Sequence, residues 1–195
     1  MDKEKKAADR IKEQSVTYEM YAAMPDDGHR YEIFDGKLEM MSPGATASHQ
    51  TISGTLFFML MQSCKSDYLI FHPPFDVILS KTNVLQPDMM MIHRSRLHLV
   101  TERGIEGAPD MVVEIISPGS RKKDRGVKME TYAKFGVQEY WVIDSDTRTL
   151  EQFQLVEENY ELIQLFDGDD RVISDKLPCV SFEVSEIFAE VMRGQ

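Results

Sequence analysis

The stretch Pro109-Asp110-Met111-Val112-Val113-Glu114-Ile115-Ile116-Ser117-Pro118 decides the fold class of this chain. Its apolar residues form a dense run that ends at Ser117-Pro118, which predicts a central strand covered on both faces. Glu114 lies in the middle of the run. A buried carboxylate without a partner is costly, so this position predicts a nearby cation or proton.

A second carboxylate has a similar setting in Leu85-Gln86-Pro87-Asp88-Met89-Met90-Met91-Ile92. We assign residues 83–93 to one strand that carries Pro87-Asp88 and then an apolar run. If this strand and the Glu114 strand are neighbours, Asp88 and Glu114 meet at one Mg²⁺ or Mn²⁺, ions that prefer hard oxygen ligands. Lys128, on the next predicted helix, would orient a metal-activated water or neutralise a phosphate.

Residue types alone leave a structural interpretation open. Aspartates often cap strand edges, and Pro-Asp pairs are common in turns. A single glutamate in an apolar strand also pairs with a structural lysine or arginine. Asp124 lies one helical turn before Lys128 and would hold its ammonium group in place.

The remaining elements follow from periodicity and turn residues. A strand, helix and strand from Glu114 to Trp141 indicate a mixed α/β sheet. We expect residues 94–107 to be a polar connection. The expected helices are 17–24, 47–64, 126–135 and 185–193, and the expected strands are 31–34 and 37–41 around Asp35-Gly36, pieces within 68–79, then 83–93, 110–116, 139–144, 149–155 and 160–166.

The composition is that of one globular domain, with 195 residues of which 42% are hydrophobic and 28% charged. We divide the chain into a charged extension, 1–16, and a single domain, 17–195. The net charge of −11 argues against broad adhesion to nucleic acid or anionic membranes, although a bound metal and a small basic rim offset it locally. No apolar stretch is long enough to span a bilayer.

The two cysteines, Cys64 and Cys179, are far apart and form no CxxC pair. This pattern supports neither a zinc site nor a disulfide framework, and it favours the reducing cytoplasm as the location.

The loop Arg121-Lys122-Lys123-Asp124-Arg125 is the densest basic segment of the sequence. Beside the proposed metal site, Arg121, Lys122, Lys123 and Arg125 would hold a nucleic-acid backbone. A solvated charged loop is the competing interpretation.

Several of these segments together resemble the Uma family of restriction-endonuclease-like proteins. The resemblance covers about residues 17–155. It is carried by Tyr31-Glu32-Ile33-Phe34-Asp35-Gly36, His49, Pro87-Asp88, the stretch Gly107 to Pro118, then Arg121, Asp124, Lys128 and Tyr132, and finally Gly136-Val137-Gln138-Glu139-Tyr140-Trp141-Val142-Ile143-Asp144.

The resemblance implies the PD-(D/E)XK nuclease fold, an α+β arrangement in which helices flank a central mixed sheet, here with an N-terminal hairpin. It also implies an endonuclease that uses Mg²⁺ or Mn²⁺ to hydrolyse phosphodiester bonds, most often of DNA. By position, Asp88 is the acidic residue of the Pro-Asp element and Glu114 that of the (D/E)XK element. The pattern requires lysine two residues after Glu114, where this chain has Ile116. Lys128 fits relatives in which the next helix supplies that lysine.

Two further residues have alternative roles. Glu32 matches an acidic position in the family's hairpin and would add a metal contact or a structural ion pair. His49 would contact a metal-bound water or a phosphate, or else form hydrogen bonds at a helix start.

Two functions follow as hypotheses. The first is a metal-dependent endonuclease, which as a homodimer would nick both strands of a duplex. The second is a catalytically silent module that binds nucleic acid or protein with the same fold, which Ile116 and the acidic charge favour.

Overall fold

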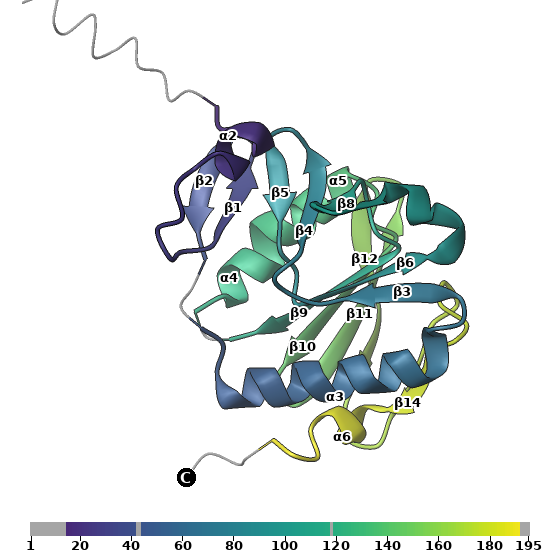
Figure 1. Ribbon diagram of the computed structural model, residues 1–195. Helices are drawn as coiled ribbons and strands as arrows, with labels where there is room; N and C mark the ends of the chain where they lie inside the picture. Colours follow the sequence, from purple (N-terminus) through teal and green to yellow (C-terminus); the bar gives the residue numbers. More distant parts are fainter. Residues whose placement is uncertain (1–14, 42–43, 118, 192–195) are drawn as a thin grey trace, which may run out of the picture.

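The computed structural model describes residues 15–41, 44–117 and 119–191. Most of the predicted extension, 1–16, therefore lies outside the described residues, as do Ser42-Pro43, Pro118 and the end of the predicted C-terminal helix. The described chain forms two six-stranded sheets and one two-stranded sheet (Figure 1).

The predicted central strand is confirmed as β9, Met111–Ile116, in which every residue is buried. It pairs in parallel with β10, Glu139–Asp144, and antiparallel with β6, Met89–His93. The full strand order of this sheet is β12-β11-β10-β9-β6-β3, with β12 at Asn159–Phe166, β11 at Thr149–Val156 and β3 at Tyr68–Phe71. The central mixed sheet and its meander thus match the sequence prediction.

Helices cover the two faces of this sheet differently (Figure 1). The long helix α3, Ala47–Cys64, lies along one face and packs Ile52, Leu56 and Leu60 into a core with the odd-numbered residues of β9. The C-terminal strands β13, Arg171–Ile173, and β14, Ser181–Glu183, lie on the same side with α6, Val184–Ile187. Helix α5, Met129–Lys134, and the second sheet cover the other face.

The second sheet has the order β2-β1-β5-β4-β8-β7. The predicted hairpin is confirmed, and Asp35-Gly36 forms its turn with φ values of 45° and 80°. Helix α2, Tyr18–Ala22, packs Tyr18 against Ile33 of this hairpin. The strands are β1, Tyr31–Phe34; β2, Lys37–Met40; β4, Asp76–Ser80; β5, Asn83–Leu85; β7, Val100–Thr101; and β8, Gly104–Glu106.

The prediction of one strand over 83–93 is wrong. The segment divides into β5 and β6, which belong to different sheets, and Gln86-Pro87-Asp88 carries the chain from one to the other. Pro87 has no N–H for a sheet ladder, which favours a strand end there. The division leaves Asp88 at the entrance to β6, directly beside β9.

Two other connections contain more regular structure than the sequence indicated. The segment predicted as a polar connection holds a 3-10 helix, Arg94–Leu99, followed by β7 and β8. The basic loop is helical: α4, Arg121–Lys123, leads through a π-helical turn, Asp124–Lys128, into α5. Gly126 has non-helical angles within that turn, which allows the irregularity.

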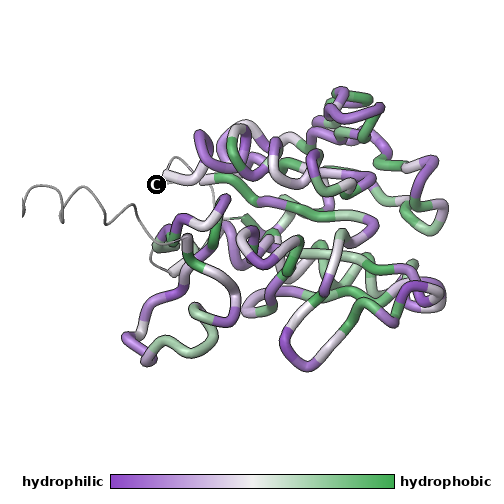
Figure 2. The backbone as a smooth tube through the Cα atoms, turned by 90° about the horizontal axis from the view of Figure 1, so that it is seen from above, coloured by the Kyte–Doolittle hydropathy of each residue, from purple (hydrophilic) through white to green (hydrophobic). Residues whose placement is uncertain are grey.

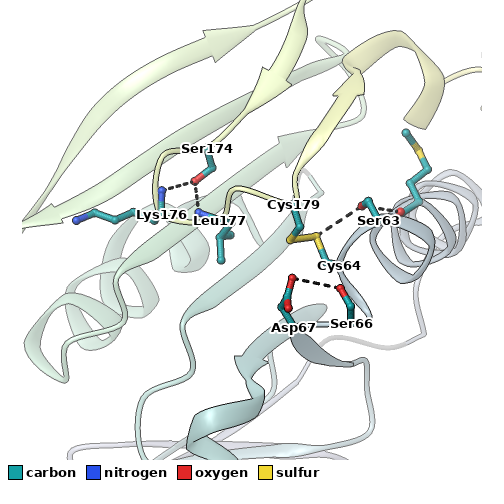
Figure 3. Close-up of a disulfide and its surroundings, with 9 residues drawn as sticks. Ser63, Cys64, Ser66, Asp67, Ser174, Lys176, Leu177 and Cys179 are labelled. Carbon is teal, nitrogen blue, oxygen red and sulfur yellow. Dashed lines mark hydrogen bonds between the residues drawn. A yellow bond between two sulfur atoms is a disulfide. The ribbon is translucent and has the colours of Figure 1, made fainter.

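The expectation that the cysteines stay unpaired is also wrong. Cys64, at the end of α3, and Cys179, in the loop before β14, form a disulfide with Cα atoms 5.1 Å apart (Figure 3). Their separation of 115 residues hid this pairing, because only the folded chain brings the end of α3 against the C-terminal strands.

The hydropathy of the chain follows this architecture. Figure 2 shows hydrophobic segments running through the interior strands, with hydrophilic segments on the outer loops. Among the described helices, none combines the length and apolar character required to cross a membrane.

Candidate active site

Glu114 projects from the middle of β9 toward the face that α5 covers. Side chains alternate along a strand, so Glu114 shares this face with Val112 and Ile116, which are both part of the core beneath α5. Ile116 therefore packs among apolar residues at the position where the nuclease pattern has lysine. The glutamate is 2% exposed and requires a partner from elsewhere in the chain.

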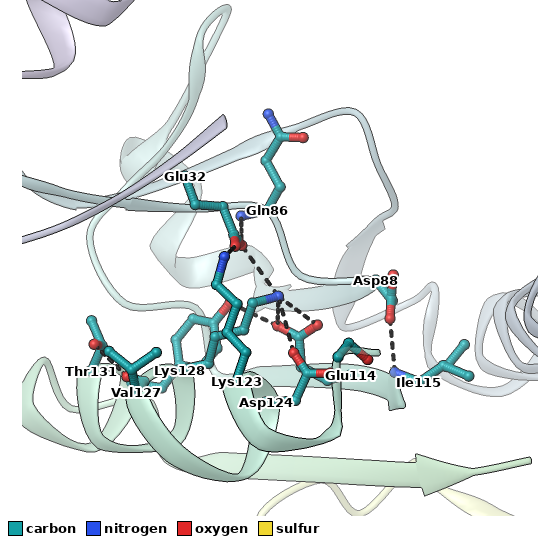
Figure 4. Close-up of polar contacts among 12 residues, drawn as sticks. Glu32, Gln86, Asp88, Glu114, Ile115, Lys123, Asp124, Val127, Lys128 and Thr131 are labelled. Atoms are coloured by element: carbon teal, nitrogen blue, oxygen red, sulfur yellow. Dashed lines mark hydrogen bonds and ion pairs between the residues drawn. The ribbon is translucent and has the colours of Figure 1, made fainter. Parts of the chain in front are cut away.

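Lys128 is that partner (Figure 4). It extends from the π-helical turn before α5, and its Nζ donates to both Glu114 oxygens at 2.9 Å. Burial disfavours the ammonium form, but the surrounding carboxylates outweigh burial and raise the pKa of Lys128 well above its usual value. The lysine therefore stays charged.

Two more carboxylates surround the same ammonium group. Lys128 Nζ lies 3.2 Å from Glu32 Oε1 and 3.5 Å from Asp124 Oδ1, the latter as the expected pair one helical turn apart. Glu32 also accepts from Lys123 Nζ at 2.8 Å. Burial acts against ionised Glu32, but the two lysines outweigh it and lower the pKa of that carboxyl. In this structure Glu32 forms the ion pair that was one of its two predicted roles.

Asp88 lies on the other side of Glu114 from Lys128 (Figure 4) and is paired with His49. Asp88 Oδ2 accepts from the backbone N–H of Ile115 at 2.8 Å and lies 3.0 Å from His49 Nε2. Burial disfavours protonated His49, but the hydrogen bond and charge of Asp88 outweigh it and raise the histidine pKa. The backbone N–H of His49 donates to Thr46 Oγ1 at the start of α3, so this residue has both a helix-start contact and a site contact.

These side chains line one pocket of about 190 Å³. Asp88, Glu114, Lys128, Glu32 and His49, all predicted from the sequence, are brought together there. The pocket continues past the first turn of α3 and the loop that follows β9.

The donor chemistry of the pocket fits a hard divalent cation. Within the ion-pair network, four carboxylates share two ammonium groups: Glu32, Glu39, Glu114 and Asp124 with Lys123 and Lys128. Glu39 is exposed, but the other three carboxylates and Lys128 are buried, so carboxylates outnumber ammonium groups in the buried part of the network. Burial raises the pKa of Glu114 well above its usual value, Lys128 opposes this effect, and the neighbouring carboxylates add to it.

No three His, Cys, Asp or Glu side chains within 15–41, 44–117 and 119–191 are arranged as a complete metal site. Mg²⁺, however, commonly uses only one or two protein carboxylates, with waters and substrate phosphates as its other ligands. Asp88 and Glu114 supply this number of ligands. Asp88 Oδ1 forms no hydrogen bond or ion pair with the described part of the chain.

The basic segment is largely engaged within the chain itself. Arg121 lies 2.7 Å from Asp144, Lys123 joins Glu32 and Glu39, and the Arg125 guanidinium is bidentate on Glu151. Lys122 is exposed and takes part in none of the ion pairs found among the described residues. Among the four predicted nucleic-acid contacts, Lys122 is thus the most available for phosphate.

Sequence reasoning missed three contributors to the site. Tyr132 donates to Glu114 Oε1 at 3.2 Å from α5, and Gln86 donates its backbone N–H to Glu32 Oε1 at 3.2 Å. Arg30 lines the mouth of the pocket. The i, i+4 spacing of Lys128 and Tyr132 was a usable signal, since it places both side chains on one helical face. No local pattern marked Gln86 or Arg30.

Comparisons with known proteins identify the family and the fold of the chain. The family model Uma2, described as "Putative restriction endonuclease", matches residues 18–185. The crystal structure of a "putative nuclease belonging to DUF820" from Anabaena variabilis aligns with a TM-score of 0.72 at 19% identity, covering 89% of this chain and 98% of that one. This likeness shows the fold.

A second solved structure, the type IIG restriction endonuclease BpuSI, aligns with a TM-score of 0.41 at 12% identity, over 76% of this chain and 16% of its own. No curated protein matches the chain.

Proposed function

The chain belongs to the Uma2 family of restriction-endonuclease-like proteins, and on that premise we propose that it is a divalent-metal-dependent endonuclease that hydrolyses phosphodiester bonds of DNA. The observation that carries the proposal is the pocket in which Asp88, directly before β6, and Glu114, on the neighbouring β9, lie with Lys128.

Membership of the family supports a cytoplasmic location, whereas the Cys64–Cys179 disulfide favours an oxidising compartment.

Asp88 and Glu114 would hold Mg²⁺ or Mn²⁺ through their carboxylate oxygens. When bound, such an ion lowers the pKa of a water and stabilises charge on a phosphoryl group. Lys128 would stabilise the negative charge that develops on the phosphate beside Glu114. Glu32 and Asp124 hold the lysine in that position through the ion pairs described above. His49 orients Asp88 through the contact with its Oδ2 oxygen.

Two of the three Pro-Asp pairs of the chain, Pro87-Asp88 and Pro109-Asp110, provide a matched test. Asp88→Asn and Asp110→Asn make the same chemical change, but Asp110 lies outside the pocket and pairs with Arg96 at 2.7 Å. We expect nicking of supercoiled plasmid with Mg²⁺ or Mn²⁺ by the wild type and by Asp110→Asn, and its loss in Asp88→Asn and Glu114→Gln. Equal activity in all four proteins contradicts the assignment. Loss in Asp110→Asn as well would show that the effect is not specific to the pocket.

A catalytically silent module is the second candidate, and one observation favours it. Lys128 engages both oxygens of Glu114, and Ile116 leaves no lysine on the strand itself. Under this alternative the wild type binds DNA and shows no nicking with either metal.

We also propose a homodimer, because two copies related by a two-fold axis can cut both strands of a duplex. Light scattering of the purified protein, alone and in complex with DNA, tests this proposal. The mass of a dimer supports it. The mass of a monomer under both conditions contradicts it.

A further inference from the structure

A second pocket lies on the opposite side of the hairpin sheet from the candidate active site. It has a volume of about 270 Å³ and lies against α2 and β1. Its lining combines rings, small apolar groups and acids: Tyr18, Tyr21, Ala22, Met24, Pro25, Asp26, Asp27, His29, Tyr31 and Asp76. Neither lysine nor arginine is among these lining residues.

The alternation of side chains separates this pocket from the active site. Ile33 is the cross-strand partner of Val84, and both pack against Tyr18. Tyr31 shares the face of Ile33, and Gln86 shares the face of Val84, whereas Glu32 points to the other face. In Figure 4 the amide of Gln86 accordingly points away from Glu32 and Lys128. The two pockets are thus divided by a single layer of strands.

Asp76 is an acid without a cation in this pocket. Its Oδ1 accepts from Gln86 Nε2 at 2.7 Å, and it forms no ion pair with any described residue. The nearby Arg103 lies over the Tyr18 ring at 5.2 Å and pairs with Glu106 instead. Burial raises the pKa of Asp76, against the hydrogen bonds that it accepts. An ionised Asp76 therefore gains from a cation that enters the pocket.

Gln86 fixes the position of Asp76 from within the sheet. The residue is 6% exposed, and its Oε1 is buried without a hydrogen-bond partner among the described residues. Since its Nε2 is fixed on Asp76, the amide cannot turn over without placing an acceptor against the carboxylate. A ligand with a charged N–H donor would give the Asp76 carboxylate the ionic partner that the neutral Gln86 amide does not supply.

The rest of the lining distinguishes an organic cation from a metal ion. Asp26 accepts from the N–H of Gly28, and Asp27 accepts from the N–H of His29 and the hydroxyl of Tyr31. Asp76 is thus the one lining acid outside this turn, and no three His, Cys, Asp or Glu side chains of the described residues are arranged to hold a metal ion. The ring centroid of Tyr21 lies 6.3 Å from that of Tyr18 and 6.5 Å from that of Tyr31. Aromatic faces attract organic ammonium ions through the ring quadrupole.

We propose that this pocket binds an alkylammonium ion, with its N–H groups at Asp76 and its carbon chain against Tyr21, Tyr31 and Met24. The proposal does not require nuclease activity, because none of the residues that line this pocket lines the active-site pocket; only Gln86, which donates to Asp76, connects the two.

The test is an NMR titration of the full chain with n-butylammonium chloride, with sodium chloride and magnesium chloride as ionic-strength controls. Saturable shifts of the ring resonances of Tyr18, Tyr21 and Tyr31, absent with both salts, are the expected result. This measurement uses the wild-type protein alone, so its outcome does not depend on whether a variant folds. Shifts that do not saturate, or that magnesium reproduces, overturn the proposal.

Two variants of equal charge sharpen this test. Asp76→Asn should weaken butylammonium binding about tenfold or more, as loss of a partly buried charge partner does. Glu158→Gln removes the same charge from the exposed turn between β11 and β12 and should leave binding unchanged. Equal weakening by both variants would show diffuse attraction to an acidic protein and overturn the site. Asp88→Asn should bind as the wild type does, whether or not nuclease activity is found.

Discussion

Lys128 Nζ lies 2.9 Å from each carboxylate oxygen of Glu114, although the two residues are 14 positions apart and come from a helix and a strand. The nuclease pattern expects its lysine on the strand, where this chain has the buried Ile116. The π-helical turn before α5 thus brings an ammonium group to Glu114, in a chain whose β9 has no lysine.

Removing Lys128 should destabilise the fold strongly. Lys128→Met would leave Glu114 and Glu32 buried without this cation, at a cost of about 3–5 kcal/mol in the free energy of unfolding. The double variant Lys128→Met/Glu114→Gln should lose less than the sum of the two single variants, because the glutamine carries no charge. Urea unfolding of the four proteins measures this coupling. Strict additivity would contradict a direct interaction.

The pair of His49 and Asp88 predicts a pH dependence of stability. The histidine pKa is raised in the folded state, so its contribution is fully present below the unfolded pKa of about 6.5 and is lost as the pH rises through the folded pKa. Urea unfolding from about pH 6 to 9 should therefore show a fall in stability that His49→Gln reduces. An identical fall in both proteins would assign the effect to other groups.

Reduction of the disulfide should lower stability without destroying the fold. The bond closes a loop of 115 residues, for which chain entropy gives an effect of about 5 kcal/mol. The urea midpoint of the wild type should fall on addition of dithiothreitol, whereas Cys64→Ser/Cys179→Ser should not respond. Two free thiols in the untreated, unfolded protein would contradict the bond.

Two residues of the basic segment should have different roles: Lys122 in DNA binding and Arg121 in stability. Lys122→Ala should weaken DNA binding and leave stability unchanged. The slope of log affinity against log salt concentration should fall by about one, which corresponds to the loss of one phosphate contact. Arg121→Ala breaks the ion pair with Asp144 and should lower stability. Fluorescence anisotropy at several salt concentrations, with thermal unfolding of the same samples, separates the two effects. A larger loss of affinity in Arg121→Ala at full stability would reverse the assignment.

Hydrophobic periodicity and turn residues predicted those elements that are determined by neighbouring residues in the sequence. The apolar run of β9, the Asp35-Gly36 turn and the stripe at Ile52, Leu56 and Leu60 each encode an element in neighbouring residues. Asp88 and Glu114 were predicted because a charge at the start of, or inside, an apolar run stands out against its surroundings, whereas Glu32 was predicted from the family resemblance.

Features that depend on tertiary contacts were not predicted. The division at Pro87 separates two sheets that no short window distinguishes from one long strand. Similarly, the partners of Arg121 and Arg125 come from β10 and β11, so the basic segment looked free in the sequence. The disulfide and the contact of Gln86 with Glu32 likewise require the folded chain.

The central claim is that Glu114 and Asp88 form a metal site, and calorimetric titration with Mn²⁺ tests it most directly. We predict one saturable site in the wild type and in Asp110→Asn, and its loss in Glu114→Gln at unchanged secondary structure. Retained binding in Glu114→Gln, or no binding in the wild type even with DNA present, would contradict the claim.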